Sequence, residues 1–389
     1  MNKSKQLKRW IMPGILVLLV IVALAALWWL NNPSSSETSE PEPDSAPAPS
    51  TSSLSVVDFG AVPDDDNDDY QAIMDCIEEA KKQGKSVYVP AGNFKVSRII
   101  TLDGVGMAGA GSDKTILTST DPENGSIDLK GRNVSLSHLA HIYETTVERG
   151  NGANEKNSIT VRGAKDFAIN HVRIEKASTA GILVQGSAEG GKIENNTIDA
   201  TGADGIHITS GSRDITIENN KVRRTGDDTI AVVSYRDGSP AASDITIRGN
   251  DVGYGSKARG ISVVGGSDVT IENNTIRDTE MAGIYIAVEK EWDTDNVKDV
   301  KVTGNTIDHT GMREPNDHPN VLVYASQGEL TEVSFTDNQI LNAPHNGIGV
   351  WGDGNIGNIY FTSNTISKSQ ETPTVFKKGT IHKENNKGF

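Results

Sequence analysis

The sequence predicts an all-β protein, a parallel β-solenoid with a capping helix at its N-terminal end. An eight-residue phrase of alternating apolar residues returns at intervals of 24 to 33 residues in the second half of the chain. The 389 residues include 39 glycines, whereas aromatic residues make up only 5%. Many short strands that end at Gly or Asn are typical of a solenoid. A helical bundle would usually contain more large apolar residues and fewer glycines.

The charge and the cysteine content restrict the classes of partner. The chain carries 52 acidic and 37 basic side chains, which gives a net charge of −15 at pH 7. Such a surface repels phosphates, so we expect no nucleic acid partner, and a polyanionic substrate is disfavoured. The single cysteine, Cys76, excludes an intrachain disulfide and a cysteine-based zinc site.

The first 53 residues are expected to lie outside the folded domain. Residues 10–30 contain no charged side chain and are long enough to span a bilayer as a helix. Four basic residues and no acidic ones stand in 1–9, so the positive-inside rule predicts a cytoplasmic head and a single-pass signal-anchor. Residues 31–53, with 5 Pro and 8 Ser, form an expected disordered linker. The domain at 54–389 is then extracellular at the cell membrane, or secreted if a signal peptide is cleaved near 23–25.

The start of the domain is expected to form the cap. Residues 55–62 favour a strand, and residues 70–82 carry apolar residues on one helical face. Asp69 is the expected N-cap of that helix, and Gly84 ends it. A strand and turn follow at 87–92. An amphipathic helix over the open end of a solenoid prevents edge-to-edge pairing.

The repeated phrase predicts the coils. Its pattern is apolar-x-apolar-x-x-Asn-x-apolar, and we expect the shared asparagines to stack their amides from coil to coil and to tolerate left-handed backbone. These asparagines are Asn196, Asn220, Asn250, Asn274, Asn305, Asn338 and Asn364. A second phrase, Gly-Ile-x-apolar, lies between them at 181, 205, 260, 283 and 347. Residues 371–389 lie outside the repeat.

The unequal intervals predict inserted loops. The longer intervals place insertions at 235–243, 288–298 and 311–319. Insertions on one side of a solenoid usually wall its binding face, so we expect these loops to surround a site.

The N-terminal segment of the domain resembles a known superfamily. The run DFGAVPDDDNDDYQAIMDCIEEAKKQGKSVYVPAGNFKV looks like the signature of the pectate-lyase-like right-handed β-helix superfamily. The resemblance covers roughly 54–366 and implies a right-handed parallel β-helix. Polysaccharide hydrolases, lyases, epimerases and phage tailspikes share this fold, so it implies the chemistry only loosely. The acidic run at 64–69 is either a solvated helix entry, which we favour, or a calcium site.

Three aspartates form the candidate catalytic cluster. Asp204 and Asp228 precede equivalent strands 24 residues apart, so they stand on adjacent coils about 4.8 Å apart, with Asp227 beside them. Crowded carboxylates push their pKa values apart, which supplies an acid and a base for glycosidic hydrolysis. We predict Asp227 as the general acid, with Asp204 and Asp228 holding and deprotonating water. Arg259 occupies the same column one coil on and is expected to favour the charged form of Asp228.

Three further residues are predicted substrate contacts. Arg259 adjoins the acids, and His207 and Tyr285 share an outward column beside them. The alternative for His207 and Tyr285 is an ordinary exposed face. Trp351, at a strand exit several coils away, is a weaker candidate for stacking on a sugar ring.

The acidic motifs resemble those of the polygalacturonase clan. ADGIHI followed by TGDDTIAV is similar to the paired motifs of that clan, in which the aspartates matching Asp204, Asp227 and Asp228 carry out inverting hydrolysis. That clan continues with Gly-His-Gly where this chain has Ala258, Arg259 and Gly260, and its Arg-x-Lys pair for uronic carboxylates is replaced by Tyr285 and Ala287. The phrase is more similar to α-1,3-glucanases and, more loosely, dextranases. The resemblance therefore implies a neutral α-glucan as substrate.

Two other functions stay open at this point. A polysaccharide lyase or C5-epimerase would use the stacked acids to bind a divalent ion and Arg259 as the base, on a uronic polymer. A non-catalytic polysaccharide binder would need no acid chemistry. For the hydrolase we expect a monomer with no cofactor and no metal, and with the polysaccharide and the membrane as its partners.

Overall fold

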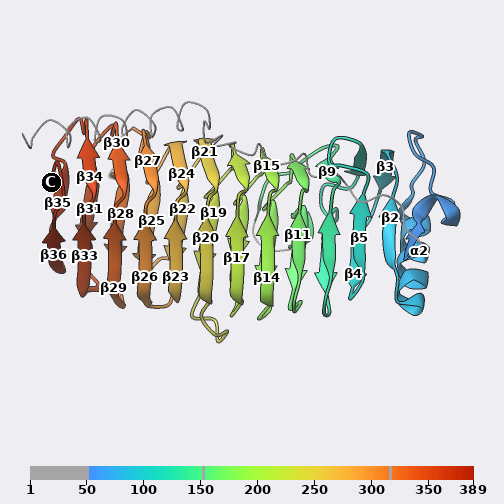
Figure 1. Cartoon of the computed structure of the whole chain (residues 1–389), viewed down its shortest axis with the longest axis horizontal. Coiled ribbons are helices and arrows are strands. Elements are labelled where there is room, and N and C mark those ends of the chain that lie inside the picture. The colour runs from blue at the N-terminus through green and yellow to red at the C-terminus, as the bar shows by residue number, and fades with distance from the viewer. Residues whose placement is uncertain (1–51, 151–153, 315–317) are drawn as a thin grey trace, which may run out of the picture. The chain divides into compact units, whose positions relative to one another are not determined.

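The computed structural model describes residues 52–150, 154–314 and 318–389, and they form a right-handed parallel β-helix with one α-helix at its start. Three parallel sheets run the length of the stack, as Figure 1 shows from one side. The predicted fold class is confirmed. The predicted segments at 1–9, 10–30 and most of 31–53 lie outside the described residues. Within the described ranges no helix is long and apolar enough to cross a membrane.

Sheet A is the longest of the three. Its strands are β1 (Ser53–Ser55), β2 (Ser86–Val89), β5 (Gly106–Gly109), β8 (Ser135–Ser137), β11 (Ala168–Asn170), β14 (Glu189–Glu194), β17 (Arg213–Glu218), β20 (Ser243–Arg248), β23 (Gly266–Glu272), β26 (Val297–Thr303), β29 (Glu329–Thr336), β33 (Asn358–Thr362) and β36 (Thr380–Glu384), with β32 (Asn355–Ile356) paired to β29.

Sheet B forms the second side of each coil. Its strands are β3 (Gly92–Val96), β6 (Thr115–Ser119), β9 (Ala140–Tyr143), β12 (Arg173–Glu175), β15 (Thr197–Asp199), β18 (Lys221–Arg223), β21 (Asp251–Ser256), β24 (Thr275–Thr279), β27 (Thr306–Asp308), β30 (Gln339–Leu341) and β34 (Thr365–Ser367).

Sheet C forms the third side and carries the candidate site. Its strands are β4 (Ile100–Asp103), β7 (Ile127–Lys130), β10 (Ile159–Arg162), β13 (Ile182–Gln185), β16 (Ile206–Ile208), β19 (Ile230–Val233), β22 (Ile261–Val264), β25 (Ile284–Val288), β28 (Val321–Ala325), β31 (Ile348–Trp351) and β35 (Thr374–Phe376). The alternate Ile and Val residues of the three sheets point inward and form one buried core.

The N-terminal cap differs from the prediction in two details. Helix α2 (Tyr70–Gln83) ends at left-handed Gly84, as expected, and buries Ile73, Cys76, Ile77 and Ala80. Asp69 is the N-cap residue, as predicted, but its side chain makes no capping hydrogen bond. Its buried carboxylate accepts the N–H of Val62, and Asp68 accepts the N–H of Tyr70.

The second detail is that residues 55–62, which were predicted to form a strand, are mostly not extended. Strand β1 begins at Ser53, inside the expected linker, and stops at Ser55, after which Val56–Phe59 form the 3₁₀-helix η1. Gly60, at φ 101°, closes this turn with its N–H bonded to the Val57 carbonyl. A left-handed backbone at Gly60 ends extended structure here. A second 3₁₀-helix, η2 (Asn154–Lys156), precedes β10.

The asparagine ladder is present as predicted. Each buried amide donates to the next side-chain oxygen, for example from Asn220 to Asn250 at 3.0 Å and from Asn250 to Asn274 at 2.9 Å. Each also donates to a strand carbonyl of the preceding coil, such as that of Ile217 for Asn250. The left-handed residue is the one before each ladder Asn, such as Asn219 at φ 55°, so the expectation of left-handed backbone at the ladder Asn itself is wrong.

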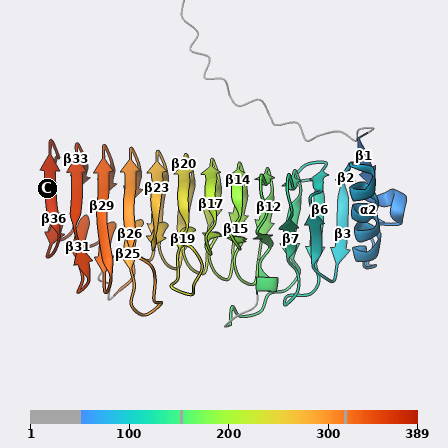
Figure 2. The same ribbon diagram turned by 90° about the horizontal axis from the view of Figure 1, so that it is seen from below.

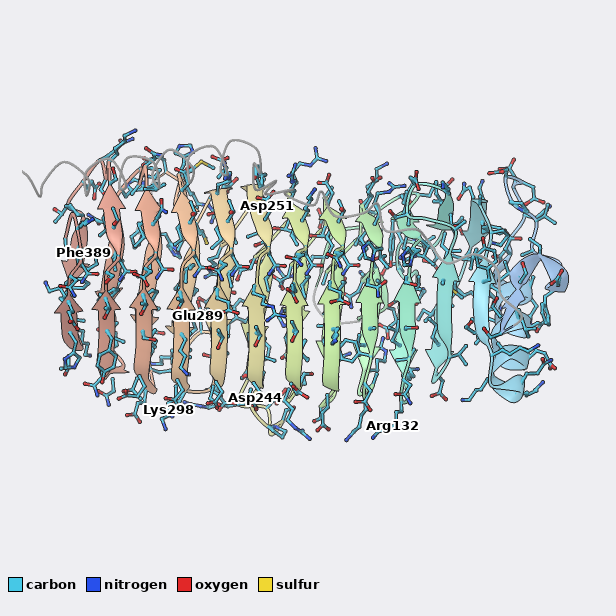
Figure 3. All side chains as sticks on the ribbon, viewed as in Figure 1. Arg132, Asp244, Asp251, Glu289, Lys298 and Phe389 are labelled. Carbon is cyan, nitrogen blue, oxygen red and sulfur yellow. The ribbon has the colours of Figure 1, made fainter. Side chains whose placement is uncertain are left out.

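The C-terminal residues belong to the repeat. Strands β35 and β36 pair with β31 and β33, and Asn386 extends the ladder by accepting the amide of Asn364. Phe389, labelled in Figure 3, packs edge-on against Phe361 and helps to cover the end of the core. Sequence analysis left 371–389 outside the coils because polar residues replace the alternating apolar ones there.

Replacing a central ladder asparagine should destabilise the stack. Asn250→Ala leaves the buried amide of Asn220 and the carbonyl of Ile217 without their side-chain partner. We expect the free energy of unfolding to fall by roughly 2–4 kcal/mol, measured as a lower urea midpoint. Asn386→Ala is the matched control at the ladder's half-buried end, and its effect should be less than half as large. Equal effects would contradict a stabilising role for the buried ladder.

Candidate active site

Strand register in sheet C brings the predicted acids together. Ile206 of β16 pairs with Ile230 of β19, which pairs with Ile261 of β22. Asp204, Asp228 and Arg259 each stand two residues before these isoleucines, so they fall in one column as predicted. One oxygen from each of Asp204, Asp227 and Asp228 lies within 4.8 Å of the others.

Asp204 is held through both of its oxygens. Oδ1 accepts the backbone N–H of Asp228 at 3.0 Å, and Oδ2 lies 2.7 Å from Nδ1 of His207. The side chain is almost fully buried in the protein but faces the cavity described below. These contacts fix the carboxylate plane beside the other two acids.

Asp228 is the most deeply held acid of the cluster. Its Oδ1 accepts the N–H of Arg259 at 2.8 Å, and its Oδ2 accepts the hydroxyl of Ser262 at 2.6 Å. Burial raises the pKa of Asp228 from 3.8 to about 6, and the charges of Asp204 and Asp227 act in the same direction. Arg259, whose Nη1 lies 3.6 Å away, lowers this pKa as expected but does not outweigh burial. The expected influence of Arg259 on Asp228 is therefore present, although burial decides the direction of the net shift.

Asp227 is the most accessible of the three acids, with 26% of its side chain exposed. Its Oδ2 pairs with Nη1 of Arg149, from the segment between β9 and β10. Burial lowers the pKa of this guanidinium, but its bond to Asp227 and the charge of Asp204 raise it above the ordinary value. Arg149 was not predicted, because it lies 78 residues from Asp227 in a segment without the repeat pattern.

Arg259 is sandwiched between an acid and an aromatic ring. Its guanidinium lies 4.5 Å from the ring centre of Tyr285, and Nη2 lies 3.3 Å from Glu289. The Tyr285 hydroxyl donates to the same Glu289 oxygen at 2.8 Å. Burial disfavours the charge of Arg259, whereas Asp228, Glu289 and Asp227 raise its pKa above the ordinary value. Tyr285 is only 3% exposed and does not line the cavity, so it supports Arg259 from beneath.

A cavity of about 850 Å³ opens above these residues. Asp204, Asp227, Asp228, His207 and Arg259 all line it. Two of the three predicted insertions supply its wall: Tyr235 and Asp237 follow β19, and Glu289, Trp292 and Thr294 follow β25. Figure 2 shows both loops on the same side of the stack. Of the described residues of 311–319, none lines the cavity.

The two wall loops are bonded to each other. Tyr235 forms an antiparallel bridge with Thr294, and the N–H of Asp295 donates to the Ser234 carbonyl at 2.9 Å. At the rim, Trp292 is 62% exposed. Glu289, labelled in Figure 3, stands at the base of the second loop. The two loops were predicted, but Glu289 and Trp292 were not, because loop residues carry no periodic signal.

The other candidates lie away from the cavity. Trp351, on β31, has Lys377 Nζ 5.4 Å from its ring centre and does not line the cavity. In the acidic run at 64–69, carboxylates bond to backbone and to Lys95, as in a helix entry. Across the described ranges, the three catalytic candidates are the one group of His, Cys, Asp and Glu whose ligand atoms lie close enough to hold a metal ion.

Comparison with known proteins identifies the family. A family model described as right handed beta helix region matches residues 93–250 and 180–366. The chain belongs to this right-handed β-helix family. The fold and superfamily expected from the N-terminal segment and the repeat are thereby confirmed.

Solved structures with the same fold differ in function. The catalytic unit of a thermostable GH87 α-1,3-glucanase from Streptomyces thermodiastaticus has a TM-score of 0.69 at 22% identity, covering 88% of this chain and 70% of that one. The A-module of a mannuronan C-5 epimerase from Azotobacter vinelandii has a TM-score of 0.59 at 19% identity, covering 86% and 98%. At these identities the likeness shows the fold alone.

A curated relative matches over a shorter stretch. The pre-neck appendage protein of Bacillus phage B103 is 27% identical over 142 residues, which is 33% of this chain. The match spans only 16% of that protein, so nothing about its activity carries over to this chain.

The raised pKa of Asp228 leads to a pH-dependent stability prediction. The folded protein binds this proton more tightly than the unfolded chain, so ionisation of Asp228 destabilises the fold progressively as the pH rises from 3.8 to about 6. Asp228→Asn removes that penalty while its amide still reaches Arg259 and Ser262. We expect the free energy of unfolding to rise by on the order of 1–3 kcal/mol at pH 8 and by much less at pH 4.

Urea unfolding at both pH values measures this difference. Asp214→Asn, at an exposed position of β17, removes the same charge from a solvated site and should change neither value appreciably. A loss of stability in Asp228→Asn at pH 8 would contradict the assignment of Asp228 as a strained, buried acid.

Proposed function

We propose that the protein is a glycoside hydrolase that cleaves a polysaccharide with three aspartates. The observation that carries the proposal is the convergence of Asp204, Asp227 and Asp228 within 4.8 Å in an open cavity, each in a different environment. Stacked carboxylates destabilise a sheet, so three of them at one point favour a catalytic role. Glycosidic hydrolysis needs one protonated and one ionised carboxyl group on either side of the scissile bond.

The proposed roles follow from access and hydrogen bonding. Asp227 is the general acid, because it is the most exposed and can reach a glycosidic oxygen once the substrate displaces Arg149. Asp204 and Asp228 bind the nucleophilic water and receive its proton. Arg259 pairs with Asp228 and Glu289, and its positive charge favours the ionised form of Asp228.

The stereochemical course is proposed from resemblance. The oxygens within 4.8 Å of one another are closer than the separations of about 6.5–9.5 Å usual for inverting enzymes and about 5–5.5 Å for retaining ones. Inversion is therefore supported by the similarity to the polygalacturonase clan motifs and not by spacing. Proton NMR of the first-formed anomer distinguishes the two courses.

A neutral polymer suits the charges of the cavity. Its lining includes five acids, namely Asp204, Asp227, Asp228, Asp237 and Glu289, against two arginines. Arg149 is paired with Asp227, and Arg259 with Asp228 and Glu289, so acids of the cavity already balance both arginine charges. A neutral α-glucan remains the first choice, supported by motif similarity. The proposal also places the domain outside the cell, tethered by residues 10–30 or secreted.

A lyase or C5-epimerase on a uronic polymer is the second candidate. The three clustered oxygens lie close enough together to hold a divalent cation, and the Azotobacter vinelandii structural neighbour is an epimerase module. This alternative requires the cation to displace Arg149. Activity abolished by a chelator would support it against hydrolysis, with an unsaturated product that absorbs ultraviolet light from a lyase and an uncleaved polymer from an epimerase.

Reducing-sugar release tests the proposed function. Purified protein is incubated with α-1,3-glucan, dextran, pullulan, polygalacturonate and alginate. We expect the protein to release reducing sugar from one neutral glucan. The rate of release should fall by at least about 100-fold in Asp227→Asn, because this substitution removes the group that donates a proton to the leaving oxygen. Asp214→Asn serves as the active control. Activity confined to a uronic polymer, or unchanged in Asp227→Asn, would overturn the proposal.

A further inference from the structure

His207 forms a hydrogen-bonded pair with Asp204 inside the cavity. It is the central residue of β16, and its Nδ1 lies 2.7 Å from Oδ2 of Asp204. The other oxygen of Asp204 is fixed by the N–H of Asp228. The imidazole lines the cavity and is 13% exposed, so it is held tightly while one edge meets the space where substrate would lie.

The neighbouring side chains leave room at this edge. In the register of sheet C, His207 lies between Leu183 of β13 and Ala231 of β19, both of which line the cavity. Ala231 is small, so the space between His207 and the Asp227–Asp228 pair is not filled by a side chain of β19.

The hydrogen bond to Asp204 determines which ring nitrogen is basic. An ionised carboxylate only accepts hydrogen bonds, so Nδ1 of His207 carries the proton that it donates to Asp204. In the neutral ring, Nε2 then has no proton and is an acceptor. Among the described residues, Nε2 has no hydrogen-bond partner. A carboxylate that orients a histidine in this way also stabilises the imidazolium formed when Nε2 takes a proton.

We propose that His207 is the catalytic base of the hydrolysis, with Asp204 as its orienting carboxylate. This inference rests on the proposed function and replaces one of its roles, because the proton of the water passes to Nε2 and not to Asp204. Asp228 remains a partner of the water, and Asp227 remains the acid.

The step conserves atoms and charge. The oxygen of one water molecule bonds to the anomeric carbon, and one of its protons goes to Nε2 of His207. The bond between the anomeric carbon and the glycosidic oxygen breaks, and that oxygen takes the proton of Asp227. The imidazolium then releases its proton to solvent, and Asp227 takes one from solvent. One water is consumed, and two hydroxyl ends are formed.

Two substitutions of His207 separate a base from a structural or sugar-binding residue. The side-chain amide of His207→Asn can replace Nδ1–H as donor to Asp204 but offers no base, whereas His207→Ala removes both. With the panel polymer that the wild type cleaves fastest, we expect kcat to fall by about 10²- to 10⁴-fold in both variants, with KM changed by less than about threefold. Added imidazole should restore part of the activity of His207→Ala, because it can occupy the vacated space.

The outcomes distinguish this inference from the proposed function. If His207→Asn keeps kcat within about threefold of wild type while Asp227→Asn is inactive, the protein is a hydrolase and His207 is not its base. A rise in KM with unchanged kcat would show that His207 binds sugar only. If the wild type cleaves no polymer, or if Asp227→Asn stays active, the proposed function itself fails and this inference fails with it.

Discussion

Hydrogen bonding between successive coils keeps equivalent backbone positions about 4.8 Å apart through the whole stack. Because the register of sheets A, B and C carries through from coil to coil, a side chain placed once per repeat meets its own counterpart. A neutral amide in that situation stabilises the structure, and Asn220, Asn250 and Asn274 donate to one another in series. A carboxylate stacked on its counterpart destabilises the structure, because the two like charges repel each other. The same register therefore produces the ladder that holds the protein together and the acidic cluster that strains it.

The strain at the cluster is distributed among specific partners. Arg149 pairs with Asp227 from a segment far away in sequence, and Arg259 reaches Asp228 from the next coil. Burial still raises the pKa of Asp228 to about 6, which means that the compensation is incomplete at neutral pH. Such incomplete compensation is typical of sites that perform proton transfer. The two bonded wall loops then enclose the cluster without filling it.

Much of this arrangement could be predicted from sequence because it follows from periodicity. The repeat indicated the coils, the ladder and the column of Asp204, Asp228 and Arg259, all of which depend only on counting residues along parallel strands. Contacts that cross between unequal loops were not predictable in this way. Arg149 lies in an irregular segment, and Tyr285 was expected on the surface, although Arg259 and Glu289 cover it. The influence of Arg259 on Asp228 was expected, but the sequence does not show the degree of burial, which raises the pKa of Asp228 despite that charge.

Isotope incorporation tests the central claim, that the three aspartates direct water onto a glycosidic bond. The protein is incubated in H₂¹⁸O with the polymer that it degrades, and the products are analysed by mass spectrometry. Hydrolysis predicts one heavy oxygen at each new reducing end, and at least about 100-fold less of this labelled product with Asp227→Asn. Fragments that lack the heavy oxygen and carry an unsaturated end would show elimination, and a polymer of unchanged length would show that no bond is cleaved.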